Sequence, residues 1–332
     1  MAETRSSFII VIGASAGGLD AISELISQFP SDINASILCV LHLSKAALGD
    51  ILVSRIQKQS SLHCKIAEDK ESIERGYVYV APPDAHLLVK EDHLIIGRGP
   101  SENRFRPSID VLFRSAAASH SETVVGIILT GLLNDGSVGM AAIKQSGGHC
   151  VVQDPNEAEY PDMPLAVLEA IEVDEVASLK NMGDVVLKII NETKPKGIKA
   201  PDKVIAESRL SEKAATSIEG VNQLGNKTSY ACPDCGGNLW EIDNGVLKHF
   251  RCHIGHTFSE SDLLVKQAEQ VEHTLWVAVR TMEERKMLLA KIARQNLERG
   301  LEKLSAHYDK QAKALDSHIN HLKGLLFGIN RA

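Results

Sequence analysis

The sequence predicts a doubly wound α/β domain with a mostly parallel sheet and a β-hairpin at one edge. A small cysteine-rich module and an α-helical tail follow it. Up to residue 193, short continuous apolar runs alternate with segments of helical apolar spacing, the pattern of a parallel sheet covered on both faces by helices. Three of the six cysteines fall within residues 232–252. Beyond residue 258, apolar residues recur in steps of three and four, which indicates amphipathic helices.

The expected strands are apolar runs, and two of them flank a polar turn at residues 90–92, which is typical of a hairpin. In chain order, the strands are Phe8–Ile12, Ile37–Leu41, Gly76–Val80, the hairpin pair His86–Val89 and His93–Ile96, Val124–Thr130 and Cys150–Val152. The helices between them have apolar residues on one face. They are Leu19–Phe29, Leu48–Ile56, Ser108–Ala118, Ser137–Lys144, Pro164–Ile171 and Met182–Ile190.

Charge and composition divide the chain into four segments. Residues 1–193 carry 15 basic against 26 acidic residues, and we expect the globular domain to span residues 5–193. Residues 194–228 lose the apolar periodicity, which predicts a flexible linker. The cysteine-rich module takes residues 229–258 and the tail residues 259–332. The apolar stripe of the tail must be buried, against a second copy or a partner helix, or within a helical hairpin of its own.

The composition excludes several classes of protein. Lys and Arg number 36 against 43 Asp and Glu, a net charge of −7, which argues against binding to nucleic acid or to an anionic membrane surface. The first residues lack the pattern of a signal peptide, and no apolar run reaches the roughly 18 residues of a membrane span. We therefore expect a soluble, cytoplasmic protein with reduced cysteines and no membrane insertion.

The clearest chemical motif follows the first strand. Residues 13–18 read GASAGG and a helix begins at once, which fits the G-x-S-x-G turn that presents a nucleophilic serine above a sheet. The candidate nucleophile is Ser15. The motif alone leaves two alternatives, a glycine-rich turn that only packs helix on sheet and a nucleotide-binding turn. The spacing is not G-x-G-x-x-G, and no acidic residue ends the second strand.

A serine nucleophile needs a base and a carboxylate that orients the base. Active sites of open parallel sheets lie at the carboxyl ends of the strands. His42 directly follows the strand Ile37–Leu41, and Asp135 follows the strand Val124–Thr130. We therefore expect Ser15, His42 and Asp135 to meet at one rim, although a turn or helix cap is a plainer interpretation of Asp135. The competing histidines lie at strand starts, on the hairpin or after a helix: His63, His86, His93, His120 and His149.

Five segments in co-linear order resemble the catalytic domain of CheB-type protein-glutamate methylesterases, over about residues 7–190. They read IGASAGG at 12–18, VAPPDAH at 80–86, RFRPSIDVLF at 104–113, ILTGLLNDG at 128–136 and DMP at 162–164. The resemblance implies a catalytic triad of Ser15, His42 and Asp135. It also implies hydrolysis of γ-glutamyl methyl esters on methylated chemoreceptor helices, with release of methanol, and deamidation of particular glutamines.

The sequence departs from the family in three places. The strand that begins at Phe8 leaves no room before it for the receiver domain that these proteins usually carry. Where the family usually has Q-H-M-P around the histidine, this chain has LHLS at residues 41–44. Leu133 occupies the position where the family has a glycine before Asn-Asp-Gly. The complete triad favours an esterase over the alternative, a catalytically silent adaptor protein of a chemosensory pathway.

The remaining candidate residues are expected to stabilise the transition state or to bind the substrate. The backbone N–H groups of Ala16 and Leu132 are expected to bind the oxyanion. Asn103, Arg104 and Arg106 precede a helix and are candidates for binding the acidic surroundings of the substrate. The alternative is that they form surface ion pairs at the helix entry.

Residues 229–258 have the ligand spacing of a zinc-ribbon-like module. Cys232 and Cys235 form a C-x-x-C knuckle, and Cys252 follows after 16 intervening residues, close to His253 and His256. We expect a structural Zn²⁺ on Cys232, Cys235, Cys252 and His256, with His253 as the alternative fourth ligand. A redox dithiol is the other interpretation. Similar tails in stand-alone CheB-like proteins favour Cys252 and His256.

Four protein ligands leave no open position on a zinc ion, so catalysis is expected to need no cofactor. The module carries two basic and three acidic residues, which argues against a DNA-reading zinc finger.

Overall fold

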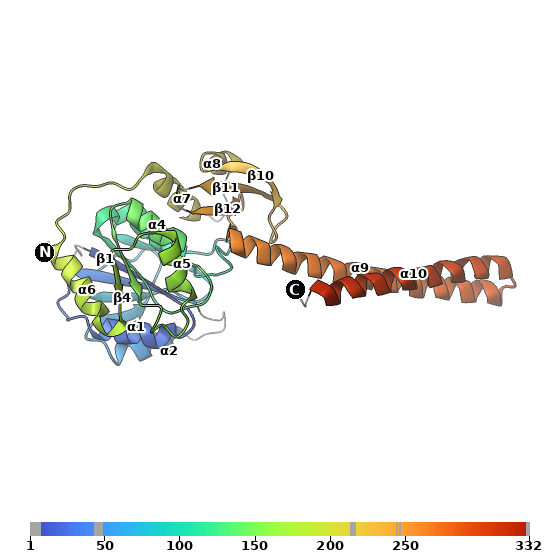
Figure 1. Ribbon diagram of the computed structural model, residues 1–332, viewed down its shortest axis with the longest axis horizontal. Coiled ribbons are helices and arrows are strands. Elements are labelled where there is room, and N and C mark those ends of the chain that lie inside the picture. Colours follow the sequence, from blue (N-terminus) through green and yellow to red (C-terminus); the bar gives the residue numbers. More distant parts are fainter. Residues whose placement is uncertain (1–7, 43–48, 213–216, 244, 246, 330–332) are drawn as a thin grey trace. The chain divides into compact units, whose positions relative to one another are not determined.

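A seven-stranded sheet, parallel throughout, runs in the order β3-β4-β2-β1-β7-β8-β9. Its strands are β1 (Phe8–Ala14), β2 (Ala35–Leu41), β3 (His63–Ile66), β4 (Tyr77–Val80), β7 (Val124–Ile128), β8 (His149–Gln153) and β9 (Glu175–Ala177). Strands β1 and β4 are labelled in Figure 1. The computed structural model describes residues 8–42, 49–212, 217–243, 245 and 247–329. The expected helix start at Leu48 and residues 43–44 of the LHLS motif lie outside this range.

Helices cover both faces of the sheet, which confirms the predicted parallel α/β architecture. One face carries α1 (Gly18–Ser27), α2 (Gly49–Gln57) and α6 (Leu179–Glu192). The other carries α3 (Ile109–His120), α4 (Ser137–Gln145) and α5 (Asp162–Ala170). Side chains of β1 alternate between the two cores, with Ile10 in the first and Ile9 in the second, as the two-residue period of a strand requires.

The predicted hairpin is present, as β5 (His86–Lys90) and β6 (His93–Gly97), but its expected place at the sheet edge is wrong. Its two strands form a separate two-stranded sheet, and β3 and β9 are the edges of the main one. The hairpin buries Leu87, Val89 and Leu94 in the core that also contains α3. Its apolar face is therefore covered by a helix, without strand pairing to the main sheet.

The segment expected to be a flexible linker contains two helices, α7 (Asp202–Glu212) and α8 (Ile218–Asn222), so the prediction is wrong for these residues. Val204 of α7 joins the core that contains α3. Glu207 of α7 is buried, 3.3 Å from an Arg114 nitrogen of α3. The segment has no apolar periodicity because polar side chains make many of its contacts with the rest of the unit.

The cysteine-rich module is a four-stranded antiparallel sheet within the same compact unit as the α/β domain. Its strands are β10 (Asn226–Ala231), β11 (Asn238–Asp243), β12 (Lys248–Cys252) and β13 (Thr257–Ser259). β11 and β12 pair antiparallel, and residues 244 and 246 between them lie outside the described range. The first strand begins inside the segment expected to be a linker.

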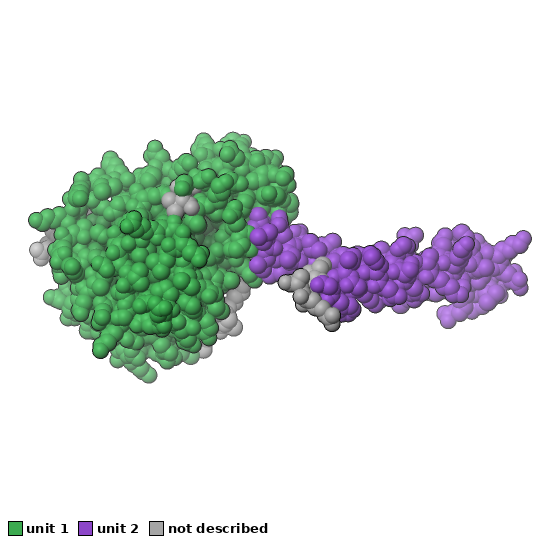
Figure 2. Space-filling view, in the orientation of Figure 1, with its two compact units in different colours: residues 1–262 green, residues 263–332 purple. Residues whose placement is uncertain are grey.

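The chain divides after Asp262 into two compact units (Figure 2). The tail is helical, as predicted: α9 (Glu260–Glu298) runs into the second unit, and α10 (Glu302–Ile329) follows a turn at Gly300, where φ is 78°. Val279, Ile319 and Leu326 form the core between the two helices. Ion pairs Lys286–Asp316 and Lys323–Glu283 fix an antiparallel arrangement.

The second unit therefore packs part of the apolar stripe within its own hairpin, one of the expected arrangements, while Leu264, Val271 and Leu301 stay exposed. None of the described helices is long and apolar enough to cross a membrane.

Candidate active site and candidate metal centre

The three triad candidates follow three adjacent strands. β1 lies between β2 and β7, and the chain continues from β1 to β2 on one side and from β7 to β8 on the other. Such divergent connections create a ligand-binding crevice at the carboxyl ends of parallel strands. Ser15 follows β1, His42 follows β2, and Asp135 lies in the loop after β7. The strands that precede Ser15, His42 and Asp135 are thus neighbours in the sheet, and the assignment of the three residues to one catalytic site stays a prediction.

Ser15 sits in a tight turn between β1 and α1. Its N–H donates to the carbonyl of Thr130 at 3.0 Å, and its own carbonyl accepts from Gly18 N–H at 2.9 Å. Gly17 has a φ of 71°, which favours glycine. A Cβ on Gly131 would lie 2.8 Å from the Ser15 Cβ, so the neighbouring loop can approach the serine only as glycine. The turn leaves Ser15 half-buried.

His42 is held on three sides. Its N–H donates to the carbonyl of Ala14 at 3.1 Å, which places it beside the end of β1. Its ring stacks on Phe105, with centroids 3.6 Å apart and planes 6° from parallel. Its Nε2 lies 2.9 Å from Oδ2 of Asp135. Its Nδ1 is buried and has no hydrogen-bond partner in the described part of the chain.

Asp135 is 1% exposed and accepts from several donors. Oδ2 accepts from His42 and from Ile109 N–H at 2.7 Å, and Oδ1 from Ser108 Oγ at 2.9 Å and Asn103 Nδ2 at 3.1 Å. Two of its donors, the N–H groups of Ile109 and Asp110, belong to the first turn of α3, where the helix dipole favours an anion. Burial alone would raise the pKa of Asp135, but the His42 hydrogen bond and these donors hold that pKa below its usual value. Asp135 is therefore ionised and His42 Nε2 donates to it.

A second buried carboxyl group, which sequence reasoning missed, lies beside the first. Asp110 accepts from Gly139 N–H at 2.6 Å and from Asn103 Nδ2 at 2.5 Å. Burial and the nearby charge of Asp135 raise the pKa of Asp110 well above its usual value. Of the two carboxyl groups, Asp135 is therefore the one that ionises more readily. Sequence spacing gave no signal for this role, because Asp110 reads as an ordinary first-turn residue of α3.

The two expected oxyanion donors border the Ser15 turn. Ala16 is half-buried next to Ser15, and Leu132 follows Gly131 with 45% exposure. Neither amide donates a hydrogen bond to another group within the described residues.

The candidate substrate-binding residues Asn103 and Arg106 form hydrogen bonds within the protein. Asn103 is 4% exposed and donates to both Asp110 and Asp135, so it supports the carboxylate from inside the protein. Arg106 donates to Asp84 at 2.8 Å and to the carbonyl of Gly99 at 2.9 Å, which is the ion-pair alternative. Arg104 is half-buried with a φ of 73°.

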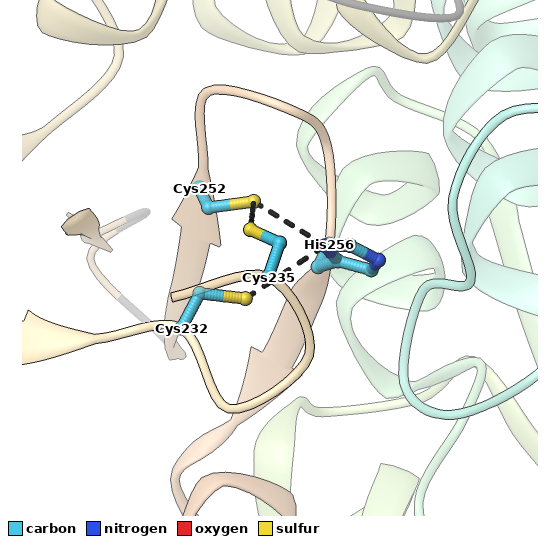
Figure 3. Close-up of side chains that lie close together, drawn as sticks. All are labelled: Cys232, Cys235, Cys252 and His256. Carbon is cyan, nitrogen blue, oxygen red and sulfur yellow. Dashed lines mark hydrogen bonds between the residues drawn. The ribbon is translucent and has the colours of Figure 1, made fainter. Parts of the chain in front are cut away.

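Cys232, Cys235, Cys252 and His256 form a cluster whose ligand atoms all lie within 4.8 Å of one another (Figure 3). The Cys235 and Cys252 sulfur atoms are 3.8 Å apart, too far for a disulfide bond of about 2.05 Å. Bonds of about 2.3 Å to a tetrahedral zinc ion place two sulfurs about 3.8 Å apart, so the spacing fits such an ion.

The fourth member of the cluster is His256, not His253. His256 Nδ1 lies 3.7 Å from the sulfur of Cys232 and 3.6 Å from that of Cys252. The ring of His253 instead faces Trp240, edge to face, at a centroid distance of 6.5 Å. Of the two histidines, the expected one is the one that the fold brings to the cysteines.

Comparisons with known proteins cover the α/β domain. Residues 10–186 match the family model described as CheB methylesterase. A curated relative from Leptospira interrogans is 39% identical over 54% of this chain and 93% of its own length. A protein-glutamate methylesterase/protein-glutamine glutaminase from Maricaulis maris is 36% identical over 54% of this chain and 46% of its own.

A solved structure has the same architecture. The crystal structure of the CheB methylesterase catalytic domain of Thermotoga maritima is 29% identical, with a TM-score of 0.54. The match covers all of that chain and 56% of this one.

Proposed function

This chain belongs to the CheB methylesterase family, and on that premise we propose that it hydrolyses methyl esters of glutamate side chains on chemoreceptor-like helices. We also propose that it deamidates glutamine side chains at such sites, as the name of the Maricaulis maris relative indicates. The observation that carries the proposal is the ionised Asp135 bonded to His42 Nε2, beside the Ser15 turn.

The proposed reaction uses this chain's own residues. His42 Nδ1 accepts the proton of Ser15 Oγ as that oxygen forms a bond to the ester carbonyl carbon, and Asp135 stabilises the resulting imidazolium. The N–H groups of Ala16 and Leu132 bind the oxyanion. When the C–O bond to the methoxy group breaks, His42 returns the proton and methanol leaves.

Water then attacks the acyl-enzyme with His42 again as base, which releases the glutamate and restores Ser15. For a glutamine substrate, the same steps release ammonia in place of methanol.

Incubation of the protein with methylated chemoreceptor membranes tests the proposal. We expect methanol to be released, and a fluorophosphonate to abolish that release by modifying one serine. Mass spectrometry of the labelled protein should place the adduct on Ser15, because His42 activates that hydroxyl group. Binding to the membranes without methanol release would favour the adaptor alternative. An adduct on another serine would contradict the assignment of Ser15.

We propose further that the Cys-His cluster holds one structural zinc ion. The sulfur and nitrogen spacings fit tetrahedral coordination, and a metal ion is a common cross-link in small modules. Bound zinc would join the 232–235 knuckle to the loop between β12 and β13. With four protein ligands, the ion has no open position for a substrate.

The adjacent histidines provide a matched pair of variants for this site. We expect the full-length protein to contain one zinc ion per chain, measured by elemental mass spectrometry. His256→Gln should lose the metal to a chelator concentration that leaves the wild type loaded, and its thermal unfolding midpoint should fall. His253→Gln should behave as wild type, because its ring lies outside the cluster. Metal-free wild-type protein, or equal losses in both variants, would contradict the proposed ligand set.

A further inference from the structure

One short turn connects the cysteine-rich module with the candidate triad. In the turn Glu102–Phe105, the N–H of residue 102 donates to the carbonyl of residue 105 at 3.2 Å, and the reverse bond is 2.9 Å. Asn103 and Arg104 between them have φ values of 49° and 73°, a conformation that the surrounding structure must hold in place. Two turn residues contact the triad: Phe105 stacks on the His42 ring, and Asn103 donates to Asp135.

The other side of the turn is held by β12, which ends in Cys252, and by β13, which directly follows His256. Arg251, directly before Cys252 on β12, is 1% exposed and donates to Glu102 Oε1 at 2.9 Å. Thr257, directly after His256, accepts from Asn103 N–H at 2.9 Å through its carbonyl. The same threonine pairs with Glu102 in a parallel β-bridge.

Glu102 is the centre of a buried charge network. Its Oε2 accepts from Arg114 of α3 at 2.6 Å, and its Oε1 accepts from Ser211 of α7 at 2.9 Å. Burial would raise the pKa of Glu102, but Arg114 and Arg251 hold that pKa well below its usual value. Removal of one partner from such a pair leaves an uncompensated buried charge, so the position of the turn depends on Arg251.

Resting on the proposed function, we propose that the turn Glu102–Phe105 positions His42 and Asp135 for catalysis. The cysteine-rich module holds this turn through Arg251 and Thr257, so ester hydrolysis depends on the ligation of the Cys-His cluster. Asn103, Phe105 and Arg251 are positioning residues in this scheme. The module thus acts on turnover without touching the substrate.

The first test is Arg251→Gln, which cuts the link and keeps all four ligand candidates. We expect one zinc ion per chain to remain, KM to stay unchanged and kcat to fall about 10- to 100-fold, the cost of a misplaced catalytic group. In proton NMR spectra, the resonance of the His42 Nε2–H should shift and broaden. Lys248→Gln is the control, since the ion pairs of this exposed residue among the described residues are with Glu241 and Asp243 of the module itself.

The second test removes the metal from the wild-type protein with a chelator. We expect the same fall in kcat and the same change at His42, with both restored by added zinc. If Arg251→Gln does not fold, the chelator experiment alone tests whether turnover depends on the metal. The coupling is refuted if kcat and the His42 resonance survive both treatments. Absence of ester hydrolysis in the wild type would instead refute the proposed function, and the His42 resonance would still report whether the module holds the turn.

Discussion

We expect Ser15→Ala to lower methanol release from methylated receptor helices by roughly 10⁴- to 10⁶-fold, because alanine removes the oxygen that bonds to the substrate carbonyl carbon. The substitution should change the free energy of unfolding by less than about 0.5 kcal/mol. The contacts that fix the turn are made by the main chain of Ser15, through the carbonyl of Thr130 and the N–H of Gly18, and alanine keeps both.

Ser137→Ala is the matched control for this prediction. Ser137 lies two residues after Asp135 at the start of α4, and its buried Oγ has no hydrogen-bond partner within the described residues. We expect this variant to keep wild-type turnover and to react with a fluorophosphonate at Ser15. Comparable methanol release from Ser15→Ala and wild type, at equal folded fractions by circular dichroism, would remove Ser15 from the reaction.

The contact between His42 and Asp135, and the place of Ser15 after the strand between theirs, could be predicted because local signals place each residue after a strand. The glycines around Ser15 mark a tight turn, and the apolar runs before His42 and Asp135 mark buried parallel strands. Parallel strands bring their carboxyl ends to one edge, so residues far apart in sequence could be assigned to one site. The orientation of the His42 ring could not be predicted, since it depends on Phe105 and on the first turn of α3.

The support of the site could not be predicted, because it depends on non-local polar contacts. Asn103 reads as a polar loop residue, yet the fold buries it between two carboxyl groups. Glu207 lies in a segment that reads as a linker, and its partners Arg114 and His249 are distant in the sequence. Apolar periodicity reports burial of apolar side chains, and it carries no signal for a helix such as α7 that is held largely by ion pairs.

In the cysteine-rich module too, residue spacing alone did not determine the fourth ligand of the cluster. Spacing identified the three cysteines and left two histidines open. The β12–β13 loop decides between them: Cys252 N–H donates to the His256 carbonyl at 3.0 Å, and this closes the loop with the His256 ring beside the sulfurs.

Asp135→Asn is expected to lower kcat by about 10⁴-fold, the cost of losing the carboxylate that orients a catalytic histidine. Both oxygens of Asp135 are acceptors in the structure: His42 and Ile109 donate to Oδ2, and Ser108 and Asn103 donate to Oδ1. An amide puts an NH₂ group at one of these positions. If it faces His42, Nε2 must become the acceptor and Nδ1 carries the proton, so His42 can no longer accept one from Ser15.

If the NH₂ group replaces Oδ1 instead, it faces the donors Ser108 and Asn103, and buried donors lose their acceptor at about 1–3 kcal/mol each. Asp135→Asn should therefore lose stability as well as turnover, unlike Ser15→Ala, and urea unfolding at neutral pH measures the difference. The lowered pKa of Asp135 in the folded protein gives this difference a pH dependence. The contribution of the carboxylate is complete above the unfolded value of about 3.9 and is lost as the pH falls through the lower folded pKa. The two proteins should thus converge in stability in acid, and an unchanged gap there, or turnover within tenfold of wild type, would contradict the assigned role of Asp135.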